Sequence, residues 1–349
     1  MYIVCLASLF VLAAIFLNGK INNGRLFFVL GAGIVVYLFA ALRGYNPLVD
    51  DVLSYIKRFE TYSYYTFSEM MEIFGYDDIK SPFFHLTGWF FSRVLPYSQA
   101  WIAFIALLYV GAVVIVIKSE SEHPVLSFVM FFALSFFGFS LSGLRQTMAM
   151  AFTTLAYFPL KKRKPIKFVL LVFLATLFHT SAIIFLLIYP IARRKLGWLQ
   201  VGIFAFAVVL FIGFEGTVRA TIATMFEDSY LSGYATKEIG LSISGFIIQA
   251  VIFAFSVFYY KDAVKRYRNI NALYNLSFAG LLFQLFSMMI AEMFRVSMYF
   301  SVFNIVLLTK AVNCERDFKI RIAEKIILPI IFLIYFFRSG IPAYRFFWQ

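Results

Sequence analysis

The sequence predicts an all-α integral membrane protein, built as a polytopic transmembrane helical bundle of about 10–12 spans. The first observation is the composition: 62% of the 349 residues are hydrophobic and 14% are charged, whereas an average soluble protein has about 25% charged residues. The second is that apolar runs long enough to cross a hydrocarbon core of roughly 30 Å recur along the chain. The third is that basic residues cluster in short loops between these runs. We therefore expect residues 1–349 to form a single integral membrane domain.

The apolar runs place the expected spans in order along the chain. They cover residues 2–17, 26–42, 98–117, 125–141, 145–160, 199–213, 241–260, 272–290, 294–312 and 326–340. The first run lacks the positively charged leading region of a cleaved signal peptide, so we expect it to be retained as a helix. The two cysteines, Cys5 and Cys314, imply no disulfide framework.

Two further segments are ambiguous. Pro82–Leu95 is apolar over much of its surface but short, and we expect a helix that lies in the outer interface. Phe168–Tyr189 is flanked by basic clusters on both sides. If both clusters are cytoplasmic, this segment is a re-entrant hairpin that breaks near His179, and otherwise it is an ordinary span. We favour the hairpin, which implies an internal site, because non-helical backbone at membrane depth must line a cavity or be buried in protein.

The formal net charge of +13 reflects topology. Basic loops such as Lys161–Lys167 and Arg193–Lys195 are cytoplasmic under the positive-inside rule, so the excess gives no reason to expect a nucleic-acid partner. Two extracytoplasmic loops follow, residues 43–97 with amphipathic helices and residues 214–240. The acidic residues and tyrosines of the first loop suit sugar binding, but the same composition also fits a solvated helix at the interface, which composition alone favours.

Arg145 is the most informative residue of the chain. Together with Gln146 it interrupts the apolar stretch from Val125 to Leu160, and no acidic residue lies near it in the sequence. An arginine inside a membrane segment costs roughly 2.5–3.5 kcal/mol on insertion scales. Its retention indicates an anionic ligand, a water-filled cavity or a distant partner, with snorkelling to the interface as the alternative.

Other polar residues within apolar segments are secondary candidates. His179 could be a structural hydrogen bonder, a general base or a substrate contact. Glu292 and Arg295 could simply pair with each other, or Glu292 could orient Arg295 toward an anionic group. Polar stripes that pack between helices or line a polar space are also expected; they comprise Gln146, Thr153 and Tyr157; Ser277, Gln284 and Ser287; and Ser297, Ser301 and Asn304.

The sequence lacks the common motifs of soluble enzymes. It has no phosphate-binding glycine loop, no HExxH zinc site, no GxSxG elbow and no Cys/His metal cluster. We therefore expect no metal or other cofactor.

Four stretches together resemble the EpsG-like branch of the Wzy-type exopolysaccharide polymerases. They are Leu42–Tyr45 followed by Asp50, Asp51 and Tyr55; Leu141–Gln146 with the basic turn Lys161–Lys167; Leu174–Ala182 around His179; and Glu292–Phe300. They occur in the family's order over most of the chain. The first stretch departs from the family pattern by an Asn-Pro insertion before its aspartates, so Asp50 and Asp51 both stay open as the matching residue.

The resemblance implies a GT-C-like fold and a bacterial enzyme of the cytoplasmic membrane. Its substrate would be an oligosaccharide repeat unit carried on undecaprenyl pyrophosphate, polymerised on the outer face for exopolysaccharide, capsule or O-antigen, without a nucleotide sugar. Partners could include membrane lipid, a flippase and a chain-length regulator.

Within this chemistry, Arg145 is the expected main contact of the pyrophosphate, since arginine binds phosphate oxygens in a bidentate manner. We expect Arg295 to assist, with Glu292 orienting it. Asp51, Asp50 or His179 would act as base or orient the acceptor hydroxyl. The remaining expected substrate contacts are Gln146, Tyr299 and Arg43.

Two rival functions use the same features differently. A lipid-linked oligosaccharide flippase would also need membrane arginines, but it predicts duplicated halves, and none is evident in the sequence. A membrane O-acyltransferase acting on polysaccharide could use His179 as base, but it would leave the acidic and aromatic outer loop unexplained.

Overall fold

The computed structural model describes residues 1–44, 52–73, 81–213, 216, 243–290, 292–339 and 344–349. Every secondary-structure element in these residues is a helix. The only β-type pairing that they contain is an isolated bridge between Arg43 and Phe346. The all-α prediction is therefore confirmed. The chain divides into two compact units: unit 1 comprises Met1–Ile183 and Asp317–Gln349, and unit 2 comprises Ile184–Arg316.

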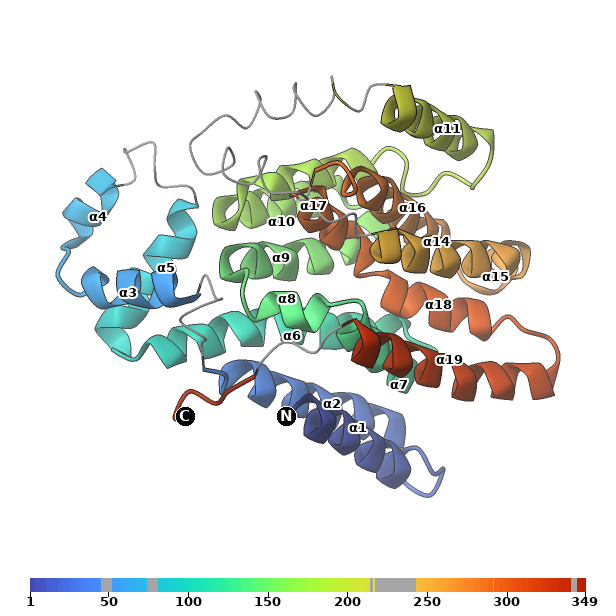
Figure 1. Cartoon of the computed structure of the whole chain (residues 1–349), viewed down its shortest axis with the longest axis horizontal. Helices are drawn as coiled ribbons and strands as arrows, with labels where there is room; N and C mark the ends of the chain where they lie inside the picture. Colours follow the sequence, from blue (N-terminus) through green and yellow to red (C-terminus); the bar gives the residue numbers. More distant parts are fainter. Residues whose placement is uncertain (45–51, 74–80, 214–215, 217–242, 291, 340–343) are drawn as a thin grey trace. The chain divides into compact units, whose positions relative to one another are not determined.

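Unit 1 is a set of helices that pack in sequence order. The helices of its main body are α1 (Tyr2–Phe16), α2 (Gly24–Ala41), α6 (Ser98–Glu120), α7 (Pro124–Ala133), α8 (Phe136–Ser140), α9 (Leu144–Lys161), α10 (Pro165–Phe178) and α19 (Phe318–Arg338). Helix α1 packs on α2, α2 on α6, α6 on α9 and α9 on α10, while α19 packs on α7 (Figure 1). The centre of unit 1 is α6, because it is apolar around most of its circumference and offers a buried face to both α2 and α9.

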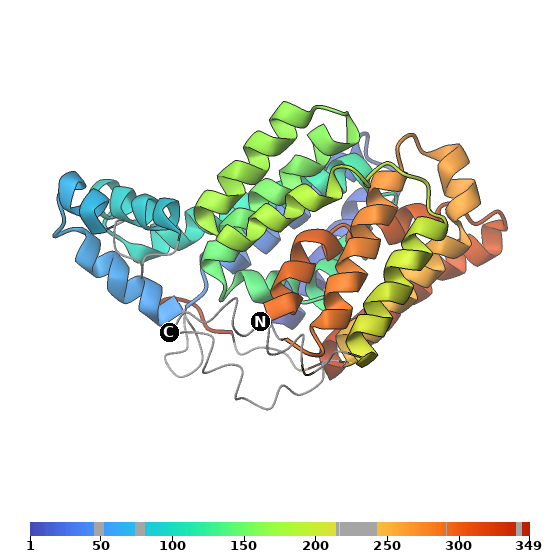
Figure 2. The ribbon, with the colours of Figure 1, turned by 90° about the horizontal axis from the view of Figure 1, so that it is seen from above.

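Three shorter helices form a separate layer of unit 1 (Figures 1 and 2). They are α3 (Val52–Tyr62), α4 (Phe67–Ile73) and α5 (Pro82–Val94). Helix α3 packs on α5, and both contact α6, where Phe59 stacks on Trp101 at a centroid distance of 5.7 Å. Thr66 and Glu69 exchange hydrogen bonds in a capping box that starts α4. Amphipathic helices are thus present in the loop 43–97, and its extracytoplasmic side stays a prediction.

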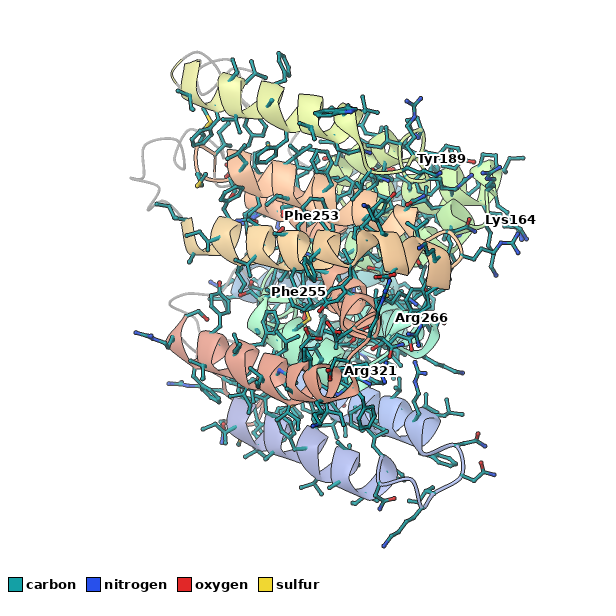
Figure 3. All side chains as sticks on the ribbon, turned by 90° about the vertical axis from the view of Figure 1, so that its right-hand side faces the viewer. Lys164, Tyr189, Phe253, Phe255, Arg266 and Arg321 are labelled. Carbon is teal, nitrogen blue, oxygen red and sulfur yellow. The ribbon has the colours of Figure 1, made fainter. Side chains whose placement is uncertain are left out.

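Unit 2 contains α11 (Trp198–Gly213), α14 (Ile243–Phe258), α15 (Tyr260–Arg266), α16 (Asn271–Phe286), α17 (Glu292–Ser301) and α18 (Asn304–Val312). Figure 3 shows α14 with Phe253 and Phe255 and, beyond it, Arg266 at the end of α15. Helix α16 packs against α17 and α14. Across these helices Gln249 Nε2 donates to Gln284 Oε1 at 3.1 Å and to Ser297 Oγ at 3.4 Å. Gln284 and Ser297, from the expected polar stripes of α16 and α17, therefore form hydrogen bonds between helices.

The structure breaks several segments that the sequence predicts as single spans. Residues 125–141 form α7 and α8, which are separated at Ser135, where φ is +63°. Residues 294–312 form α17 and α18, which are bent by 46°. The chain also breaks at His179, where α10 ends and a 3-10 helix, Thr180–Ile188, begins. A break near His179 is thus confirmed, and its re-entrant character stays a prediction.

Two helices in the described residues, α2 and α6, are long and apolar enough to cross a membrane, and the number rises to four if each bent pair is one span. The pairs are α14 with α15 and α17 with α18. Shorter apolar helices of 10–17 residues are α1, α7, α10 and α11. The count of about 10–12 spans stays a prediction.

Candidate functional site

Arg145 lies in the first turn of α9, directly after a tight turn at Ser142 and Gly143. A Cβ on Gly143 would lie 2.6 Å from Cζ of Phe139, so this turn requires glycine. No side chain caps the helix, and the amides of a first helical turn lack acceptors within the helix and carry partial positive charge. A cation at this end is unfavourable for the helix itself. Its presence is consistent with an anion that both the guanidinium and the helix terminus would bind.

The side chain of Arg145 contacts α3. Its Nε donates to the hydroxyl of Tyr55 at 3.3 Å, and its guanidinium carbon lies 5.8 Å from the centroid of the Tyr55 ring. Tyr55 in turn packs edge-on against Phe84 of α5 at 5.2 Å. These contacts place Arg145 at the junction of α9, α3 and α5. The half-buried guanidinium keeps access to solvent on part of its surface.

A second polar pair lies beside this junction. The Tyr62 hydroxyl and Nδ1 of His85 are 2.5 Å apart, and the two residues are 5% and 4% exposed. Burial raises the pKa of the Tyr62 phenol, whereas the charges of Arg58 and Arg145 lower it. Tyr55, Arg58 and Tyr62 are spaced by three and four residues on α3, so they share one face of the helix. Tyr62 and His85 are not among the site residues predicted from the sequence, although the spacing of Tyr62 with Tyr55 and Arg58 was a visible signal for Tyr62.

Gly88 makes the Tyr62–His85 pair sterically possible. A Cβ on Gly88 would lie 2.6 Å from Cε2 of Tyr62 and 3.1 Å from Cζ2 of Trp101. We expect Gly88→Ala to displace Tyr62 and to lower stability by about 1–3 kcal/mol, the usual cost of overpacking. Thermal unfolding of the purified protein measures this loss. The matched control is Gly111→Ala on α6, where no atom lies within 4 Å of the new Cβ; an equal effect at both glycines would contradict the steric explanation.

His179 lies at the end of α10 and belongs to the same region of unit 1. The ring of the preceding Phe178 stacks on Phe152 of α9 at 5.4 Å and meets Phe83 of α5 edge-on at 6.1 Å. Because α9 and α10 are joined by a short turn and run antiparallel, the end of α10 lies toward the start of α9. The His179 Nδ1 is 2.9 Å from the Ser181 hydroxyl, and its ring is partly exposed.

Two predicted substrate contacts are buried. Gln146 is 2% exposed and lies, like Thr153 and Tyr157, on the buried side of α9. Arg43 is 4% exposed, and the C-terminal segment holds its backbone. Here the Gly44 amide donates to the Arg345 carbonyl at 2.7 Å, and Gln99 Nε2 donates to the Arg43 carbonyl at 3.1 Å. Both side chains are therefore buried in this structure, and their contact with a substrate stays a prediction.

The remaining predicted residues fall elsewhere. Asp50 and Asp51 lie outside the described residues. Glu292, Arg295 and Tyr299 lie on α17 of unit 2, where Arg295 is exposed and Tyr299 is fully buried. The group around Arg145 is a feature of unit 1, and the assistance of Arg295 stays a prediction. Within the described part of the chain, no three His, Cys, Asp or Glu residues form a metal-binding group.

One comparison with known proteins gives a match. The family model described as "EpsG family" matches residues 26–348, which include most of α2 and the whole group around Arg145. No curated protein and no solved structure matches the chain.

Proposed function

Because the chain belongs to the EpsG family, we propose that it is a membrane glycosyltransferase that polymerises exopolysaccharide. It joins oligosaccharide repeat units carried on undecaprenyl pyrophosphate at the outer face of the bacterial cytoplasmic membrane. The growing chain on one lipid is transferred to the non-reducing end of a unit on another. The observation that carries this proposal is the placement of Arg145 at the start of α9, against Tyr55.

The reaction needs cationic groups where the glycosidic bond to the carrier breaks. As that bond breaks, its electron pair passes to the pyrophosphate, so negative charge on the leaving group increases toward the transition state. Fixed donors that meet this charge stabilise the transition state more than the ground state. The Arg145 guanidinium stays protonated when half-buried and binds phosphate oxygens in a bidentate manner.

Tyr55 supports this role by restricting the arginine. Its hydroxyl accepts from Arg145 Nε, and its ring lies under the guanidinium. Binding through Nε leaves the charge of the guanidinium unchanged, and its planar fork suits phosphate oxygens. A side chain held in this way loses less freedom when the pyrophosphate binds. His179, at the same end of unit 1, and Asp50 or Asp51 are further candidates for binding the acceptor hydroxyl.

The experiment is a glycan profile of a deletion strain with and without the wild-type gene. We expect the deletion strain to display single repeat units outside the cell and to lack long chains, and the wild-type gene to restore the chains. Lipid-linked units trapped in the cytoplasmic leaflet would instead show a flippase. Unchanged chain lengths with altered acetyl content would show an O-acyltransferase.

A further inference from the structure

We propose that Tyr62 and His85 form a proton relay, which receives the proton of the acceptor hydroxyl during chain transfer. This inference rests on the proposed polymerase function. It assigns a role to two residues of unit 1 that the proposed reaction has not used so far. The relay lies on α3 and α5, beside Arg145 of α9.

A direct hydrogen bond between the two side chains gives the relay its path. The oxygen of Tyr62 and Nδ1 of His85 are 2.5 Å apart, and the rings meet edge-on at 83°. The chain leaves space for this contact by placing a glycine at position 88 against the Tyr62 ring. Tyr62 is 5% and His85 4% exposed, so the pair is shielded from bulk water, and Tyr62 shares one face of α3 with Tyr55, which contacts Arg145.

The surrounding charges give the relay its direction. Burial raises the pKa of the Tyr62 phenol, so the phenol is protonated. In the tautomer that the relay requires, it donates to an unprotonated Nδ1, and the second ring nitrogen of the neutral imidazole carries the hydrogen. Arg58 and Arg145 favour negative charge on the phenol oxygen. They therefore stabilise that oxygen at the moment when its proton has moved toward His85 and before it has accepted another.

The steps balance without an additional reactant. The acceptor oxygen forms a bond to the anomeric carbon of the donor chain while the bond from that carbon to the pyrophosphate oxygen breaks. The electron pair of the broken bond stays on the pyrophosphate, opposite Arg145. The proton of the acceptor hydroxyl passes to the Tyr62 oxygen while the Tyr62 proton passes to Nδ1 of His85. After the product leaves, the path runs in reverse: His85 returns its proton to the Tyr62 oxygen, and the Tyr62 hydroxyl releases one to water.

The test uses full-length protein in membranes and lipid-linked repeat units extracted from the deletion strain. We expect Tyr62→Phe to lower kcat by about 100-fold, the usual worth of general base catalysis, with KM within twofold of wild type. His85→Asn is the decisive variant, because an amide oxygen can accept the Tyr62 hydrogen bond but cannot take up a proton. We expect it to lose kcat to the same degree, with a thermal stability close to that of wild type.

The matched control is Tyr64→Phe, on a tyrosine that is 84% exposed and lies two residues from Tyr62; its kcat should equal that of wild type. Near-wild-type kcat in His85→Asn would reduce His85 to an orienting role and overturn the relay. A raised KM with unchanged kcat in Tyr62→Phe would overturn it as well. Failure of the polymerase function is distinguishable, since wild-type protein would then produce no chains from the same units.

Discussion

Replacing Arg145 with alanine is expected to remove long polymer chains, with single repeat units accumulating in their place. The guanidinium is held by Tyr55 at the start of α9, where the proposed leaving pyrophosphate gains charge. Loss of one preorganised donor to a developing anion typically lowers kcat by about 100- to 1,000-fold. Arg145→Lys should recover part of the activity, because an ammonium keeps the charge but lacks the planar fork.

The Arg145 variants are measured by gel profiles of lipid-linked and surface glycans, read together with the amount of protein in the membrane. Arg338→Ala serves as the control, because Arg338 is an exposed arginine at the end of α19 in the same unit. Near-wild-type chain lengths in Arg145→Ala at normal protein levels would exclude the proposed role of Arg145.

Replacing Lys161 with alanine is expected to destabilise the protein more than removing a charge from a solvated ion pair. Lys161 Nζ lies 2.5 Å from Glu120 Oε1, and their side chains are 25% and 6% exposed. The ammonium also lies 5.8 Å from the centroid of the Tyr157 ring. Removal of Lys161 takes away a cation that pairs with a buried carboxylate, and breaking such a pair typically costs about 3–5 kcal/mol. We expect the lower end of that range, because Lys161 is partly solvated.

Thermal unfolding of the purified variant measures this loss of stability. The double variant Glu120→Gln with Lys161→Ala should recover part of it, because it removes the buried charge together with its partner. Arg316→Ala is the matched control, since the pair of Arg316 with Asp262 has a similar distance of 2.7 Å but is largely solvated, so its loss should change stability little. Equal losses from both pairs would contradict the role assigned to burial.

Local sequence signals were enough for the fold class and for parts of the site. Length, apolar content and helical periodicity predict an all-helical membrane protein, because backbone groups in lipid must bond within their own segment. The start of α9 at Leu144 falls in the gap between the expected spans 125–141 and 145–160, and α10 ends at Phe178, next to the break expected near His179. The interruption of residues 125–141 was missed, because no glycine or proline marks the positive φ of Ser135.

The sequence by itself determined the class of protein and the family. It also singled out Arg145 as a candidate, because an arginine in an apolar run has an energetic cost. Only the tertiary structure decided which residues surround it. Tyr55 lies 90 positions from Arg145 and His85 lies 23 from Tyr62, and contacts over such separations depend on how α3, α5 and α9 pack. Packing also buried Gln146 and Arg43. Whether a polar side chain is buried depends on which elements pack against it, and this cannot be read from its local sequence.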